Sequence, residues 1–526
     1  MLHGAVIMKK SKLLLLFAIV PSVISLSGCF SSLFKKNEEI VVELPTINVV
    51  ESLKINLNYE TEKRIVPSLS DSSISNPKFL YSSSNSSVAT VNNEGVISGI
   101  DVGEATITVK FQANQDVKAN VKVNVVRETR REYDYTIMYY MCGSDLEYID
   151  DQTRQSDQAF FTRDIQEILS VDIPSNVKLI IETGGAKKWF LTQSYLDGAT
   201  KISSTNLQRW EVSNHKLKLI DTLDANHMAT EASFTSFLSW GLDDYYATQM
   251  GVVISGHGGG LAGCAYDDNY TYKYGDNYFD YTLLTNQVGA ASQLALANST
   301  KDKFTWIGYD CCLMQCADIA TINAQSYEYM VASQETELAS GWDHDQYLPM
   351  LASNPYVSPE TFLPKICSTF VSQYHTTVCK TNNPCLQTLS VLDLSKINPL
   401  ITAFNNLTTE IGGVSSRAYN VAAAAFNNCY NSFGESVYGL CDMVSFMNEL
   451  SDYSSAASVI SAVRNLVIAN EYCSRYEEDV CGLNAFFPMS LDGRYSLQVG
   501  RNEYSVLSTK FTTWQAMCYA FGNYDF

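Results

Sequence analysis

Four short apolar runs, separated by polar or amphipathic stretches, constrain the fold of this chain more than any other feature. They are YTIMYYM (135–141), VKLIIET (177–183), MGVVISG (250–256) and FTWIGYD (304–310). Apolar runs of this length are typical of strands that are buried on both faces. Strands that alternate with helices predict an α/β fold with a mostly parallel sheet covered by helices.

The intervening and following stretches favour helices. Residues 230–246 place Phe234, Phe237 and Leu238 at helical spacing, after Thr230, a residue type that caps helices. The tail of the chain is predicted to be helical over long stretches, including residues 454–473. It returns to an apolar strand in GLNAFFP (482–488).

Two of the predicted strands end in side chains that carry chemistry. His257 stands in a glycine-rich turn, and Asp310, Cys311 and Cys312 follow the next strand. Functional groups in open parallel sheets collect beyond the carboxyl ends of the strands, so we expect a base and a thiol to meet there. The glycines bring the backbone close to a substrate and leave amides for an oxyanion. A structural histidine at a strand end is the alternative.

Strand parity separates the two adjacent thiols. Side chains alternate between the faces of a strand, so Asp310 and Cys312 share one side while Cys311 shares the other with Tyr309. A carboxylate beside the nucleophile suits a site that holds a basic substrate side chain. Cys312 is therefore the predicted nucleophile, and Cys311 is expected to be buried in the protein.

The sequence pattern of residues 47–127 predicts a separate small β-domain. Short runs rich in β-branched residues are divided by Asn, Gly, Ser and Asp, and Asn92, Asn93 and Gly95 form a hairpin signal. Residues 81–111 resemble the bacterial immunoglobulin-like group 2 family, which implies an all-β sandwich used as a spacer or adhesive module. The charged stretch RETRREYD (127–134) is the predicted linker.

The chain begins with a targeting signal. MKKSKLLLLFAIVPSVISLSGC (8–29) has lysines, an apolar stretch and small residues before Cys29. Its end, LSGC, resembles the lipobox of bacterial lipoproteins, which implies a signal peptide over residues 1–28, a lipid on Cys29 and a tether over 29–46. We therefore expect a protein of the bacterial cell envelope, lipid-anchored to a membrane and exposed outside the cytoplasm. An ordinary cleaved signal is the alternative.

Composition narrows the possible partners. The formal net charge of -20 excludes nucleic acid and a basic lipid-binding patch. At 526 residues the chain is large enough for two or more domains. Thirteen cysteines remain once Cys29 is assigned to lipid, but a chain of this size needs no disulfide framework. No metal site is assigned, and we expect a monomer.

Five segments bear a specific resemblance. They are YTIMYYMCGSDLE, the helix with GVVISGHGGG, GYDCCLMQ, ASQETELASGWDHDQYL and GLNAFFP, and they look like the landmarks of the clostripain-like cysteine peptidases. That family belongs with the caspases, legumains and gingipains, and the match covers residues 134–526. It implies a caspase-like α/β/α sandwich. In the family's Asp-Ala-Cys pattern Cys312 matches the cysteine, and Cys311 replaces the alanine.

The resemblance implies an endopeptidase that cleaves protein or peptide substrates after Arg or Lys. Cys312 would attack the peptide carbonyl and His257 would protonate the leaving amine, with backbone amides near Gly258 and Cys312 stabilising the oxyanion. Asp310 is the expected floor of the specificity pocket, because a carboxylate pairs well with a guanidinium. Asp343, in preference to Glu335, is the expected second acid.

Family members are often activated by self-cleavage between the histidine and the cysteine. Residues 266–282 are expected to form a polar loop in which Lys273 is the only basic residue and the expected cleavage point; an uncut surface loop is the alternative. No cofactor is expected to be required. Some relatives respond to calcium, for which Asp267, Asp268 and Asp276 are candidate ligands.

The sequence leaves two alternative functions. HGGG also occurs as an oxyanion motif of lipases and esterases, but that class needs a G-x-S-x-G elbow, which this chain lacks. A surface adhesin or binding protein with a degenerate peptidase domain is the second alternative, since the immunoglobulin-like segment favours a binding role.

Overall fold

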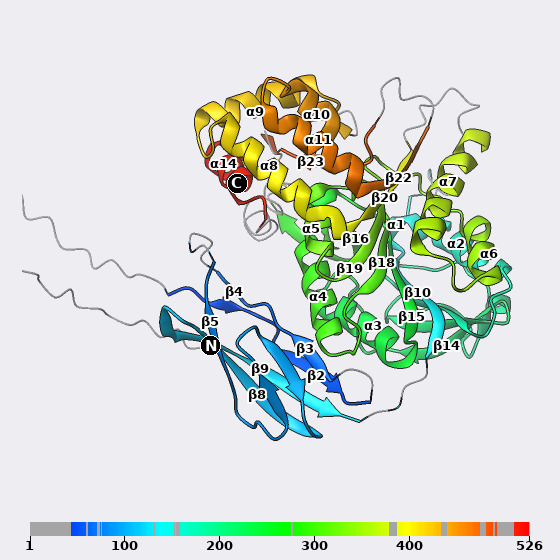
Figure 1. Ribbon diagram of the computed structural model, residues 1–526. Coiled ribbons are helices and arrows are strands. Elements are labelled where there is room, and N and C mark those ends of the chain that lie inside the picture. The colour runs from blue at the N-terminus through cyan, green and yellow to red at the C-terminus, as the bar shows by residue number, and fades with distance from the viewer. Residues whose placement is uncertain are drawn as a thin grey trace, which may run out of the picture.

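The protein folds into a small all-β domain and a larger α/β domain (Figure 1). The computed structural model describes residues 44–58, 61–70, 74, 76–127, 129, 132–151, 153, 158–274, 277–377, 387–432, 439–473, 480–487, 490–491 and 510–524. The predicted signal peptide, Cys29, most of the predicted tether and Asp276 lie outside the described residues.

The N-terminal domain is a β-sandwich. One sheet has the strand order β2-β9-β8-β5 and the facing sheet the order β3-β7-β6. Alternate residues of the long strand β8, among them Ile107 and Val109, point into the shared core. The predicted immunoglobulin-like sandwich is confirmed. Its strands are β1 (Ile47–Asn48), β2 (Ser52–Asn56), β3 (Glu62–Arg64), β4 (Ser68–Leu69), β5 (Phe79–Ser83), β6 (Ala89–Val91), β7 (Val96–Gly99), β8 (Gly103–Phe111) and β9 (Asn114–Val126).

The larger domain is built on a sheet of ten strands within the described residues, in the order β12-β14-β13-β11-β10-β15-β18-β19-β20-β22. The five central strands, from β11 to β19 in that order, pair in parallel. The strands that flank them, β13 and β20, pair antiparallel. The mostly parallel sheet that the apolar runs predict is confirmed. The strands are β10 (Tyr133–Cys142), β11 (Val177–Gly184), β12 (Leu196–Asp197), β13 (Gln208–Ser213), β14 (Lys216–Thr222), β15 (Ala247–Ser255), β18 (Phe304–Asp310), β19 (Tyr327–Ala332), β20 (Thr388–Asp393) and β22 (Val467–Tyr472).

Helices cover both faces of this sheet, as side-chain alternation along β10 shows. Met138 and Tyr140 pack in one core with α3, α4 and α5, whereas Tyr139 and Met141 pack in the other with α2, α6 and α7. Thr230 caps α3 as predicted, its side chain accepting the N–H of Ser233. The result is the predicted α/β/α sandwich. These helices are α2 (Phe160–Ser170), α3 (Glu231–Asp244), α4 (Thr285–Ala297), α5 (Ala317–Asn323), α6 (His344–Ser353) and α7 (Pro359–Thr377).

A C-terminal group of helices extends the first of these cores (Figure 1). The prediction of a helix over 454–473 is wrong beyond Leu466, because β-branched Val467 and Ile468 open a strand, β22, that pairs with β20 at the edge of the sheet. The remaining elements are α8 (Ile397–Ile411), α9 (Ser416–Asn428), α10 (Met443–Glu449), α11 (Ser454–Leu466), α14 (Thr512–Phe521), β21 (Leu440–Asp442), β23 (Asn484–Phe486), β24 (Ser490–Leu491) and β25 (Asn523–Tyr524).

The two domains touch at the amino-terminal edge of the large sheet. Lys63 Nζ donates to the carbonyl of Leu296 at the end of α4, at 2.6 Å, and Ser52 Oγ donates to Asn298 Oδ1 at 3.2 Å. Since α4 runs back from the carboxyl edge and leads into β18, the immunoglobulin-like domain lies at the end of the sheet opposite to His257 and Cys312.

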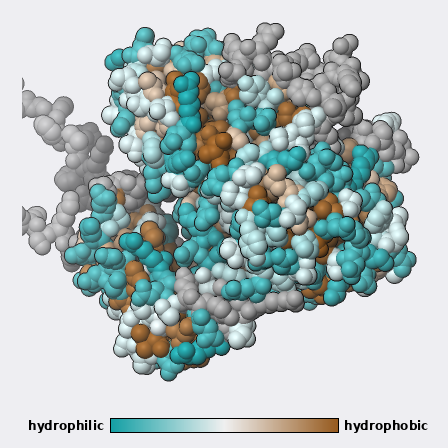
Figure 2. Space-filling view, turned by 45° about the vertical axis from the view of Figure 1, so that its right-hand side comes forward, coloured by the Kyte–Doolittle hydropathy of each residue, from teal (hydrophilic) through white to brown (hydrophobic). Residues whose placement is uncertain are grey.

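On the face that Figure 2 shows, hydrophilic residues predominate and hydrophobic residues form scattered groups. This pattern agrees with the strong negative charge of the chain. Among the helices of the described ranges, none combines the length and the apolar character needed to cross a bilayer.

Candidate active site

Two neighbouring strands bring His257 and Cys312 to the same edge of the sheet. Parallel strands β15 and β18 stay in register up to the pair Ser255–Asp310, and the N–H of Gly256 donates to the carbonyl of Asp310 at 3.2 Å. His257 and Cys312 each lie two residues beyond this last pair. Neighbouring strands are about 4.8 Å apart, so the two turns emerge side by side.

A third strand end supplies a carboxylate that the sequence reasoning missed. Strand β10 neighbours β15, and the short helix α1 (Ser144–Glu147) follows it. Asp145 in α1 places Oδ1 2.6 Å from His257 Nε2. Its signal in the sequence was present, because Asp145 follows a buried strand in MCGSDLE just as His257 and Cys312 follow theirs. This contact fixes the orientation of the imidazole ring. Asp145 engages Nε2 and leaves the other ring nitrogen, Nδ1, for a different partner.

Gly258 is the point where the two turns meet. A Cβ atom at this position would lie 2.3 Å from the carbonyl oxygen of Cys312 and 2.9 Å from its nitrogen. Only glycine therefore permits this approach of backbone to backbone. Leu313 follows with a φ of 66°, a left-handed conformation that is costly for a residue with a branched side chain and that bends the chain sharply after Cys312.

The two adjacent thiols have different surroundings. Cys311 is buried, its Sγ donates to the carbonyl of Ile254 at 3.4 Å, and burial raises the pKa of the thiol well above its usual range. Cys312 is partly exposed, and its Sγ accepts the backbone N–H of Glu337 at 3.2 Å. Burial raises the pKa of the Cys312 thiol, the Glu337 N–H opposes this shift, and the Asp310 carboxylate adds to it.

Beside Cys312 lies a buried group of acids. Burial raises the pKa of Asp310 to about 6, while the backbone N–H of Trp342 hydrogen-bonds the carboxylate. Glu337 adjoins both Asp310 and Cys312, and burial together with the Asp310 charge raises its pKa well above the usual range. Two such carboxylates in contact share a proton or need a cation. The sequence reasoning missed Glu337, although it stands in the quoted segment ASQETELASGWDHDQYL.

The two acids that the sequence reasoning compared lie in other surroundings. Glu335 accepts a hydrogen bond from the Tyr430 hydroxyl at 2.5 Å. Asp343 groups with Glu167 and Asp345. Burial, followed by a hydrogen bond with Asp345 and the Asp345 charge, raises the pKa of Asp343 to about 7.

Next to Asp343, His344 is fully buried, although its sequence surroundings are polar. Its Nδ1 lies 2.6 Å from the Tyr347 hydroxyl, and burial lowers the pKa of the imidazole to about 3, so the ring is neutral. One ring nitrogen lies within 4.8 Å of carboxylate oxygens of Asp164 and Asp310.

Comparison with known proteins identifies the larger domain. A model of the clostripain family matches residues 140–517. The chain belongs to the clostripain family. It is therefore a cysteine peptidase, and a model of the bacterial Ig-like domain (group 2) matches residues 63–121 before it. No curated protein matches the chain.

Solved structures share the fold of this clostripain-family chain. A secreted C11 cysteine protease from Bacteroides thetaiotaomicron, "iotapain", is 15% identical with a TM-score of 0.50, over 74% of this chain and 99% of that chain. An inactive zymogen C11 protease from Parabacteroides distasonis is 15% identical with a TM-score of 0.51, over 74% of this chain and 100% of that chain. At this identity the likeness shows the fold alone.

In this clostripain-family domain the segment between His257 and Cys312 is more ordered than the sequence suggests. The expected loop is a hairpin of β16 (Cys264–Tyr274) and β17 (Asn277–Leu283), because its alternating tyrosines and polar residues pair across the turn. Lys273 is exposed, and it pairs with Tyr278 next to that turn.

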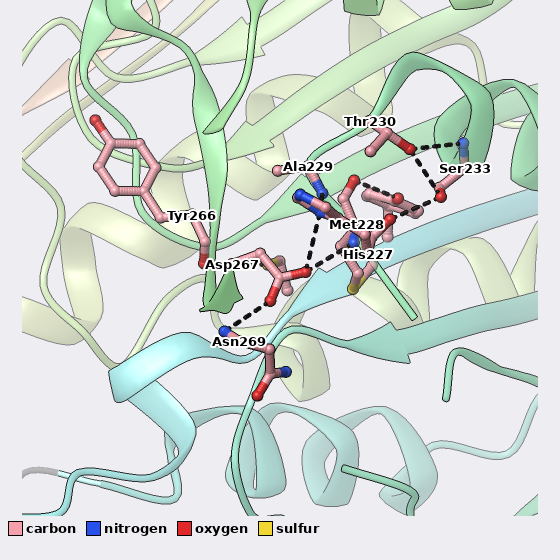
Figure 3. Close-up of polar contacts among 10 residues, drawn as sticks. His227, Met228, Ala229, Thr230, Ser233, Tyr266, Asp267 and Asn269 are labelled. Carbon is pink, nitrogen blue, oxygen red and sulfur yellow. Dashed lines mark hydrogen bonds and ion pairs between the residues drawn. The ribbon is translucent and has the colours of Figure 1, made fainter. Parts of the chain in front are cut away.

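The hairpin also carries two of the three candidate calcium ligands. Asp267 is fully buried, and its two oxygens accept the N–H groups of Met228 at 2.8 Å and Asn269 at 3.0 Å (Figure 3). His227 Nδ1 lies 3.5 Å away. Both oxygens of the Asp267 carboxylate, a candidate calcium ligand, thus already accept hydrogen bonds from protein N–H groups. Asp268 is half-buried, and burial followed by the Asp280 charge raises its pKa to about 7.

Proposed function

We propose that the protein is an endopeptidase that cleaves after Arg or Lys with Cys312 as nucleophile and His257 as its acid–base partner. The contact of Asp145 with His257, at the edge where Gly258 meets Cys312, carries the proposal. His257 takes the thiol proton, the thiolate attacks the peptide carbonyl, and the imidazolium protonates the leaving amine. Water then hydrolyses the thioester with His257 as base.

Asp145 is the positioning residue in this scheme. A carboxylate on Nε2 selects the tautomer that leaves Nδ1 for the thiol, and it stabilises the imidazolium when the proton is transferred. The raised pKa of the Cys312 thiol requires such a partner, because a thiol whose pKa lies above its usual range does not ionise unaided at neutral pH. Backbone amides at Gly258 and Cys312 are the proposed oxyanion donors, each worth roughly 3 kcal/mol.

The acids beside Cys312 support specificity for a basic side chain. Asp310 and Glu337 are two adjoining buried carboxylates, and a guanidinium or an ammonium group between them supplies the missing positive charge. Glu337 is the second acid that we propose, in place of Asp343, because Glu337 adjoins Asp310 and its N–H contacts the Cys312 sulfur.

Hydrolysis of fluorogenic peptides ending in Arg, Lys, Asp or Asn tests the proposal. We expect turnover of the Arg and Lys peptides, its loss in Cys312→Ala and its survival in Cys311→Ala. Asp310→Asn should lower kcat/KM for the Arg peptide about 100-fold, since breaking a buried charge pair costs about 3 kcal/mol. Equal loss in Cys311→Ala would overturn the choice of nucleophile. Absence of all peptide hydrolysis would favour a binding protein with a degenerate peptidase domain.

The LSGC motif supports a location in the bacterial cell envelope with a lipid on Cys29. Cys29→Ala should move the protein from the membrane fraction to the soluble fraction, and an unchanged distribution would contradict lipidation. The exposure of Lys273 supports self-cleavage at this residue. Intact mass should show two fragments in the wild type and one chain in Cys312→Ala; identical fragments in both would contradict self-processing.

A further inference from the structure

A compact group of three potential metal ligands lies beside the candidate active site. It consists of Asp164, Asp310 and His344, and only Asp310 has a role in the proposed function. Each offers one ligand atom, and these atoms all lie within 4.8 Å of one another. They come from three different elements, α2, the end of β18 and the start of α6, and all three side chains are buried.

The hydrogen bonding of the His344 imidazole favours a role as a metal ligand. Nδ1 contacts the Tyr347 hydroxyl at 2.6 Å, and that hydroxyl lies 3.1 Å from the hydroxyl of Tyr139. His344 Nε2 is buried and has no hydrogen-bond partner in the described part of the chain. When Nδ1–H donates to Tyr347, the lone pair of Nε2 is left open, which is the arrangement in which a second hydrogen bond fixes a metal-binding histidine.

The two carboxylates provide the remaining ligands and the charge. Asp164 Oδ1 also has no hydrogen-bond partner among the described residues. The neighbouring guanidinium of Arg163 turns away, lying 4.8 Å above the Phe160 ring and donating to the Gln158 carbonyl. Within the described residues, neither Asp164 nor Asp310 forms a salt bridge with a basic side chain, although the Arg163 charge acts on Asp164 from a distance. Two buried carboxylates without a salt-bridge partner gain most from a divalent cation.

We propose that Asp164, Asp310 and His344 bind one Zn²⁺ ion, and that this ion blocks the pocket in which Asp310 receives a basic side chain. One nitrogen and two oxygens suit Zn²⁺, whereas Ca²⁺ takes oxygen ligands only. Ligand atoms around one Zn²⁺ lie roughly 3.5 Å apart, so small side-chain movements complete the set. The blocking of the pocket rests on the proposed function; the binding of zinc does not.

A second acidic group offers a route for the ion. Glu167, Asp343 and Asp345 lie within ligand distance of one another, and Glu167 and Asp345 are partly exposed. Glu167 Oε2 accepts the backbone N–H of His344 at 3.1 Å, so this outer group adjoins the inner one. A cation attracted from solvent would therefore pass from the outer carboxylates to the inner group.

Zinc binding is tested by calorimetric titration of chelator-treated Cys312→Ala protein, which removes the Cys312 thiol as a competing ligand beside the proposed site. We expect one Zn²⁺ per chain, with binding at least ten-fold weaker in His344→Gln and in Asp164→Asn. His215→Gln, which alters an exposed histidine paired with Asp172, is the matched control and should bind as the parent does. Thermal melting of each variant shows whether it folds.

Two outcomes would overturn the site. One is unchanged affinity in the folded His344→Gln and Asp164→Asn proteins. The other is a sulfur-to-metal charge-transfer band when Co²⁺ replaces Zn²⁺, because it would place the ion on cysteines. If His344→Gln does not fold, Asp164→Asn decides alone.

The effect on the pocket is tested with wild-type enzyme and an Arg peptide. Zn²⁺ at ten times its dissociation constant should raise KM about eleven-fold and leave kcat unchanged. A fall in kcat at constant KM would refute the blocked pocket. If no basic peptide is cleaved without Zn²⁺, the proposed function fails, and the calorimetry still decides whether zinc binds.

Discussion

Replacing Gly258 with alanine should disrupt the contact that brings the His257 turn against Cys312. The added methyl group would lie 2.3 Å from the Cys312 carbonyl oxygen and 2.9 Å from the Cys312 nitrogen, whereas ordinary contacts begin at 3.4 Å. Both clashes are with backbone atoms, so one of the two turns must move by about 1 Å. A displacement of that size at a catalytic centre costs roughly 100-fold in rate, or about 2.7 kcal/mol.

Gly259→Ala is the matched control. Its methyl group would meet the Tyr266 hydroxyl oxygen at 2.4 Å, which is the end of a side chain that can rotate away. The assay is kcat/KM for a basic peptide in both variants, with thermal melting to show that each is folded. We expect a loss of about 100-fold in Gly258→Ala and less than ten-fold in Gly259→Ala. Equal activities in the two folded variants would refute the reasoning from backbone contact.

Three further predictions concern the carboxyl groups of Asp145, Asp268 and Glu147. Asp145→Asn should lower kcat by 10²- to 10⁴-fold with little change in KM, because the amide no longer holds the His257 tautomer, and an unchanged kcat in steady-state kinetics would remove Asp145 from the scheme. The pKa of Asp268 is about 7 in the folded protein and 3.8 ordinarily, so the unfolded chain loses this proton at a lower pH than the folded protein does. The free energy of unfolding should therefore fall as the pH rises from 4 to 7. The expected fall is roughly 1–2 kcal/mol after allowance for the partial exposure of Asp268. Asp268→Asn should reduce the difference in unfolding free energy between pH 5 and pH 8 in urea titrations, while Asp310 and Asp343, whose pKa values are also raised, keep the rest. A difference equal to the wild type's would contradict the assignment. Glu147→Ala should destabilise the protein by about 3 kcal/mol in the same assay, since the buried Glu147 carboxylate accepts three hydrogen bonds, two from Thr162 and one from the Phe190 N–H; a loss under about 1 kcal/mol would argue against this role.

The sheet was predictable because its signal is local. Four of the five central strands contain a predicted run of apolar residues that is buried on both faces, and their bounds lie within three residues of those runs. The fifth, β19 (YEYMVA), carries an exposed Glu328 and was not among the predicted strands. The strand Val467–Tyr472 was mistaken for helix because its sequence continues a helical pattern. Only pairing with β20, a strand that lies about 80 residues earlier, decides its conformation.

The arrangement of the candidate site was predictable in part. His257 and Cys312 stand directly after strands, and parallel topology brings such positions to one edge. The roles of Asp145 and Glu337 depend on contacts with distant residues, and no periodicity records those contacts. His344 shows the same limit, because polar neighbours in sequence did not reveal that its ring turns into the core.

The docking of the immunoglobulin-like domain also has a directional consequence. Its contacts with Leu296 and Asn298 place it at the end of the peptidase domain opposite to the edge that carries His257 and Cys312. The immunoglobulin-like domain therefore does not cover the edge that carries His257 and Cys312. A protein substrate accordingly reaches that edge without having to displace the N-terminal domain.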